Sequence, residues 1–69
     1  MAKPNLFDTA APEVQRNMIN DVIAMAEQEC HTEIDAEAAV RIARRVLAGK
    51  RTRDALYRVS TARMCKLVR

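Results

Sequence analysis

The chain has 69 residues and carries 12 Lys or Arg against 9 Asp or Glu, for a formal net charge of +3. This length allows one small domain with a marginal core, and it is too short to build an enclosed enzyme pocket from several elements. No apolar run approaches the roughly 20 residues of a membrane span, so we expect no membrane insertion.

The charges are divided between two halves of the chain. Residues 1–40 contain two basic and eight acidic residues, whereas residues 41–69 contain ten basic residues and one acidic residue, Asp54. Blocks of opposite sign matter for association because each attracts a surface of the other sign.

The first half predicts an arm followed by a long helix. Residues 1–10 contain Pro4 and no periodic apolar pattern, which predicts a loose N-terminal arm before a single helical domain over residues 11–69. Pro12 suits the first turn of a helix, and the apolar period continues to about residue 30. The apolar face covers nearly half of the helix circumference, which is wider than one neighbouring element needs. We therefore expect a second protomer to cover it, with four residues at the dimer interface: Val14, Met18, Val22 and Met25.

The second half predicts two more helices. Either Thr32 or Asp35 can cap a helix over about residues 35–48, and Gly49 supplies a left-handed stop. No Gly or Pro interrupts the amphipathic segment 53–68, so the pattern predicts one continuous helix there. No strand pattern competes. The predicted fold class is all-α, a small three-helix protomer (or a helical hairpin with an arm) that forms a helical homodimer.

A cluster of basic residues is the first candidate site. Arg41, Arg44 and Arg45 are three and four residues apart, a spacing that places side chains on one side of a helix. Guanidinium groups bind carboxylates and phosphates through paired hydrogen bonds. The pattern is typical of an anion-recognition surface, although a solvated face neutralised by the acidic half or by a dimer mate has the same composition. The candidate partner-binding residues are Arg41, Arg44, Arg45, Lys50, Arg51 and Arg53.

The segment 54–68 offers an alternative reading. Val59-Ser60-Thr61-Ala62-Arg63-Met64-Cys65-Lys66-Leu67 resembles the turn and recognition helix of LacI-type repressors, whose helix enters the DNA major groove. This resemblance implies a dimeric DNA-binding regulator in which Thr61, Arg63 and Lys66 face DNA. Arg58 and Asp54 depart from the family pattern, because they stand where a turn Gly and a small apolar residue belong.

No residues predict catalysis, a cofactor or a metal. Cys30, His31 and Cys65 lack the paired spacing of a zinc finger, and Gly49 is the only glycine, which excludes a Gly-rich phosphate loop. The two cysteines are too few for a disulfide scaffold, so we expect free thiols that act as small apolar fillers in a reduced cytoplasm. The beginning of the chain lacks the apolar stretch of a secretory signal, in agreement with that compartment.

As a whole, the short, Arg-rich and aromatic-poor helical chain, with Ala-Val-Arg-Ile-Ala-Arg-Arg-Val-Leu-Ala-Gly at 39–49, is similar to small early proteins of bacteriophages. In particular it resembles the anti-quorum-sensing proteins of Mu-like phages of Pseudomonas. The resemblance implies a non-enzymatic dimer in the cytoplasm of a bacterial host. Such a dimer binds and inhibits a larger host regulatory protein, for example a transcriptional activator of the quorum-sensing type. Self-assembly through the two oppositely charged halves is a third hypothesis.

Overall fold

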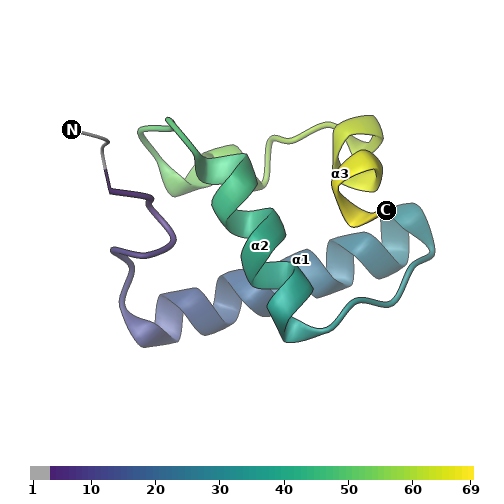
Figure 1. The fold of residues 1–69 in the computed structure, drawn as a ribbon, viewed down its shortest axis with the longest axis horizontal. Helices are drawn as coiled ribbons and strands as arrows, with labels where there is room; N and C mark the ends of the chain where they lie inside the picture. The colour runs from purple at the N-terminus through teal and green to yellow at the C-terminus, as the bar shows by residue number, and fades with distance from the viewer. Residues whose placement is uncertain (1–3) are drawn as a thin grey trace.

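A computed structural model describes residues 4–69 of the chain, and its helices are joined by turns and loops (Figure 1). Within that range it contains three α-helices, one short 3-10 helix and no strand, which confirms the all-α class. The elements in chain order are α1 (Pro12–Cys30), α2 (Ala36–Leu47), η1 (Arg53–Leu56) and α3 (Thr61–Val68). Helix α2 crosses α1, and α3 lies beside the C-terminal end of α1. Among residues 4–69, no helix has the length and apolar character needed to cross a membrane.

Helix α1 spans the range predicted from its apolar period. It begins at Pro12 without a side-chain cap and ends at Cys30. His31 follows as the C-cap, with a left-handed φ of 51°, and donates its backbone N–H to the carbonyl of Ala26. The broad apolar face is covered from two directions by α2 and α3 of the same chain. Met18 and Val22 are therefore buried inside the protomer core.

This packing corrects the predicted dimer interface. Met18 and Val22 have 2% and 0% of their surface exposed, so neither is accessible to a second protomer. Val14 and Met25 are half-buried and pack against the same core. The width of the face is explained by two intramolecular neighbours rather than by a partner. A homodimer remains a prediction, but the apolar face on which that prediction was based is covered within the protomer.

Helix α2 begins at the second of its two predicted caps. The Asp35 carboxylate accepts a hydrogen bond of 2.8 Å from the backbone N–H of Ala38, as the N-cap position requires. Thr32 instead donates its hydroxyl to the carbonyl of Cys30. The chain leaves the helix through Gly49, whose φ of +72° is the predicted left-handed conformation. The face that α2 contributes to the core consists of Ala39, Ile42, Ala43, Val46 and Leu47.

The predicted continuous helix over 53–68 is wrong, because the chain breaks between η1 and α3. Ser60 starts a new helix, with its hydroxyl accepting a hydrogen bond from the backbone N–H of Arg63 at 3.2 Å. The break changes the direction of the chain, so that η1 packs on α2 while α3 packs on α1. Leu56 and Met64, one on each side of the break, are both fully buried. A local apolar period cannot reveal this change, because both segments keep one apolar face.

The two cysteines are joined, contrary to the prediction of free thiols. Cys30, the last residue of α1, forms a disulfide with Cys65 in α3, with their Cα atoms 5.4 Å apart. This distance lies within the range that a disulfide can bridge. Because 35 positions separate the two residues in the sequence, only the packing of α3 on α1 brings them together.

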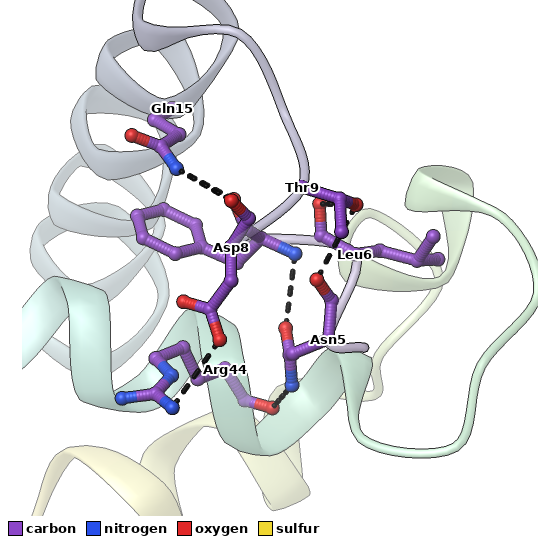
Figure 2. A network of polar contacts seen from close by, with 7 residues as sticks. Asn5, Leu6, Asp8, Thr9, Gln15 and Arg44 are labelled. Atoms are coloured by element: carbon purple, nitrogen blue, oxygen red, sulfur yellow. Dashed lines mark hydrogen bonds and ion pairs between the residues drawn. The ribbon is translucent and has the colours of Figure 1, made fainter. Parts of the chain in front are cut away.

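The N-terminal segment is docked rather than loose over its described part, residues 4–10. Asn5 donates its amide to the carbonyl of Arg44 at 2.7 Å, and Gln15 of α1 donates to the carbonyl of Phe7 at 2.8 Å (Figure 2). Phe7 and Ala10 are buried in the core. The segment forms a turn that is stabilised by the Asn5 side chain, which accepts from the backbone N–H of Phe7. Residues 1–3 of the predicted arm lie outside the described residues.

Candidate functional site: a cationic groove between α2 and α3

A groove with a volume of about 510 Å³ lies between α2 and α3. Two apolar side chains, Ile42 of α2 and Leu67 of α3, contribute to its lining. Every other lining residue is basic, and these residues come from both helices and the C-terminus: Arg41, Arg45, Arg63, Lys66 and Arg69. We call this feature the α2–α3 groove.

Helical spacing explains how each wall is formed. On α2, Arg41 and Arg45 are four residues apart, so they lie on the same side of the helix, next to Ile42 at the edge of the buried face. On the other wall, Arg63, Lys66 and Arg69 follow one another at intervals of three residues along and just beyond α3. The groove therefore has an apolar contribution from each helix and cations from each helix.

The cations of the groove have no acidic partner. No acidic residue lines it, and the one ion pair found within residues 4–69 joins Arg44 to Asp8 elsewhere. Asp35 caps α2, and Asp21 and Glu29 accept hydrogen bonds from Tyr57 and Thr61. Like charges this close repel one another, and a bound anion relieves that repulsion. The arrangement is thus suited to a ligand that carries several negative charges.

The structure divides the predicted arginine cluster. Arg41 and Arg45 line the groove, whereas Arg44, which points about 100° away from Arg45 around the helix, pairs with Asp8. Lys50 and Arg51 border a second hollow, of about 380 Å³, together with Pro4, Leu6 and Thr9. Arg53 is exposed on η1 and lines neither hollow.

The residues predicted for DNA contact are also divided. Arg63 and Lys66 are exposed, but they line the groove together with the arginines of α2. Thr61 donates its hydroxyl to Glu29 of α1 at 2.6 Å, so it is engaged within the protein. Arg69 belongs to neither of the two predicted sets. The signal that could have found it is its spacing of three residues from Lys66.

Metal binding and thiol chemistry have less support in the structure than anion binding does. Among residues 4–69, no group of three or more His, Cys, Asp or Glu side chains is placed to hold a metal ion. Cys30 and Cys65 are bonded to each other, and His31 is exposed at the end of α1.

Comparison of the chain with protein-family models, curated proteins and solved structures finds no match. The function is therefore inferred from the chemistry of the α2–α3 groove.

Proposed function

We propose that the protein is a non-enzymatic interaction module that binds an acidic segment of a larger regulatory protein in the α2–α3 groove and thereby inhibits it. The single observation that carries the proposal is a hollow lined by five cations and two apolar side chains, with no carboxylate among its lining residues. The resemblance to phage proteins that disarm host regulators supports the regulatory and inhibitory part of this proposal.

The composition of the groove favours a protein segment as its ligand. Carboxylates of Asp or Glu can form paired hydrogen bonds with the guanidinium groups of Arg41, Arg45 and Arg63. Ile42 and Leu67 offer contact to apolar side chains of the same segment, a combination of apolar centre and polar rim that is common in protein interfaces. Arginine is also enriched among the residues that dominate binding energy at such interfaces.

The test uses an acidic peptide in which Glu alternates with Leu, labelled with a fluorophore, and measures binding by fluorescence anisotropy. We expect Arg45→Glu and Arg63→Glu to weaken binding by about tenfold or more each, since a hydrogen bond between charged groups contributes about 1.5–3 kcal/mol. Arg58→Glu is the matched control because it makes the same charge change at an exposed residue outside the groove. A peptide with Lys in place of Glu is expected not to bind. Equal losses in all three variants would show that only net charge matters and would contradict the proposed site.

Duplex DNA binding is a second candidate, and one observation favours it. The chain does break before Ser60, and Ser60 caps a short helix with Arg63 and Lys66 exposed, as the repressor resemblance implies. However, the element before the turn is a 3-10 helix of 4 residues, and Arg63 and Lys66 line a hollow with α2. A recognition helix has to enter the major groove of DNA, and a helix whose basic residues border a concavity is less suited to this.

A gel shift with duplex DNA separates the two candidates. A DNA-binding protein would shift the duplex at about 50 mM salt and lose most of its affinity by about 200 mM, because each phosphate contact releases counterions. We expect no shift by the wild-type protein under conditions in which the acidic peptide binds. A shift that disappears in Arg63→Glu and Lys66→Glu, together with absent peptide binding, would favour the DNA-binding function.

A further inference from the structure

One cysteine of the disulfide is adjacent in sequence to a residue that lines the α2–α3 groove. Cys65, which is bonded to Cys30 at the end of α1, immediately precedes Lys66, a lining residue of the groove. Helix α3 and the residue after it supply three of the five cations, Arg63, Lys66 and Arg69. Whatever holds α3 in place therefore holds one wall of the groove.

Apart from the disulfide, α3 has few attachments. It has 8 residues, which is below the length at which an isolated helix is stable in water. Only Met64 is fully buried, while Leu67 and Val68 are half-buried. The one side-chain hydrogen bond that links α3 to another helix and involves no sulfur joins Thr61 to Glu29, at an exposed position. Exposed polar contacts of this kind contribute little to stability because water competes for both groups.

We propose that the Cys30–Cys65 disulfide is a redox switch that controls the α2–α3 groove. With the bond formed, α3 is docked on α1 and the groove has both walls. With the bond broken, α3 undocks in a large fraction of the molecules. Of its five cations, the groove then keeps only Arg41 and Arg45. The consequence for binding rests on the proposed function, whereas the control of α3 by the bond does not.

The reaction is an ordinary thiol–disulfide exchange with a dithiol. One thiolate of the dithiol attacks a sulfur of the bridge, so that the bond between Cys30 and Cys65 breaks and a mixed disulfide forms. The second thiol of the reductant displaces the cysteine from this mixed disulfide. The protein gains two electrons and two protons as two thiols, and the dithiol becomes a disulfide. Both cysteines are half-buried rather than enclosed in the core, so a small thiol has access to them.

The Cys30–Cys65 disulfide is better placed for a switch than a disulfide inside the core would be. It joins the last residue of α1 to α3, not to α2 or the N-terminal turn. Neither cysteine is among the buried residues of the core, such as Met18, Val22 and Ile42, although Cys30 packs against that core. Because α3 supplies one wall of the groove, the groove would be complete only under oxidising conditions.

The first arm of the test measures binding of the labelled Glu/Leu peptide to the oxidised protein and to the protein reduced with dithiothreitol. We expect the apparent Kd to rise about tenfold on reduction if the docked fraction of α3 falls to about a tenth. The Cys30→Ser/Cys65→Ser double variant is expected to bind like the reduced protein, with or without dithiothreitol. Equal binding by the oxidised and reduced proteins would overturn the switch.

The second arm follows the order of α3 directly, by limited trypsin digestion and mass spectrometry. Reduction is expected to accelerate cleavage after Arg63 and Lys66 more than cleavage after Arg16 in α1. Unchanged rates at all three sites would overturn the switch. So would equal acceleration at all three, because the bond would then stabilise the whole fold rather than α3. If the oxidised protein fails to bind the peptide, the proposed function is wrong, and this digestion alone decides whether the disulfide controls α3.

Discussion

Asp8 in the N-terminal turn and Arg44 in α2 form an ion pair, with the carboxylate Oδ2 3.3 Å from the guanidinium Nη2 (Figure 2). The carbonyl of the same Arg44 accepts the hydrogen bond from Asn5. Arg44 is thus used to attach the turn to α2, while the neighbouring Arg45 is free of ion pairs within residues 4–69 and lines the groove. Two adjacent arginines therefore have different roles.

The different roles predict different effects of two matched variants. Both side chains of the Asp8–Arg44 pair are about half-exposed, so Arg44→Ala should lower the free energy of unfolding by no more than about 1 kcal/mol. Its affinity for the acidic peptide should remain that of the wild type, whereas Arg45→Ala should weaken binding. Urea unfolding and anisotropy measure the two quantities. A loss of affinity in Arg44→Ala as large as in Arg45→Ala would contradict the division of the cluster.

Phe7 tests whether the N-terminal turn belongs to the core. Its side chain is only 5% exposed, and replacing a buried Phe by Ala removes its apolar contacts and leaves a cavity. We expect Phe7→Ala to lower the free energy of unfolding by about 3 kcal/mol or more, measured by urea denaturation. Leu6→Ala, at a half-buried neighbour, is the control and should have a smaller effect. A loose arm would show no effect of either change.

The raised pKa of Tyr57 predicts that the protein loses stability at alkaline pH. Partial burial, the hydrogen bond that its hydroxyl donates to Asp21, and the negative charges of Asp21 and Asp54 raise the pKa of Tyr57 from 10.0 to about 12. A raised pKa means that the folded state favours the protonated phenol. Its contribution to stability is therefore complete below pH 10 and is lost as the pH rises through about 12.

The measurement is direct because Tyr57 is the only tyrosine and the chain has no tryptophan. Phenolate absorbance should titrate near pH 12 in the folded protein and near 10 in urea. Asp21→Asn should shift the folded pKa toward 10.0, since it removes one of the two nearby charges. Titration of the wild-type folded protein at the ordinary pKa would contradict the Tyr57–Asp21 contact.

The disulfide predicts a large difference in stability between the oxidised and reduced proteins. The bond joins residues 35 positions apart, and constraining an unfolded chain over a loop of that length contributes about 3–4 kcal/mol. Cys30→Ser/Cys65→Ser should lose that amount relative to the oxidised wild type in urea unfolding. Reduced wild type and the double variant should then have similar stability. A double variant as stable as the oxidised protein would show that the bond does not constrain the chain.

Sequence patterns predict those helices whose ends and apolar faces depend on residues that are close together in the sequence. The apolar period and Pro12 predict α1. For α2, the Asp35 cap and Gly49 predict a helix over about residues 35–48, and each predicted end lies within one residue of the observed one. Each of these signals acts within a turn or two of helix, so the residues involved are close in the sequence. The break before Ser60 is not marked by a Gly or Pro, and the amphipathic period continues across it.

The candidate site could be predicted only in part. Arg41 and Arg45 indicate an anionic partner, whereas the repressor resemblance assigns Arg63 and Lys66 to DNA. Nothing in the spacing shows that these two sets line one hollow, because their proximity depends on how α3 turns back beside α2. The same is true of Cys30 and Cys65.

The division of charge along the chain was determined by the sequence alone, as were the all-α class and two of the three α-helices. The tertiary structure decided which charges remain available. It pairs Arg44 with Asp8, engages Asp21 and Glu29 in hydrogen bonds, and leaves the cations of the α2–α3 groove without a carboxylate among its lining residues. The physical reason is that helix formation depends on neighbours in sequence. Pairing of charges and cysteines depends instead on distances that only the packing of the helices sets.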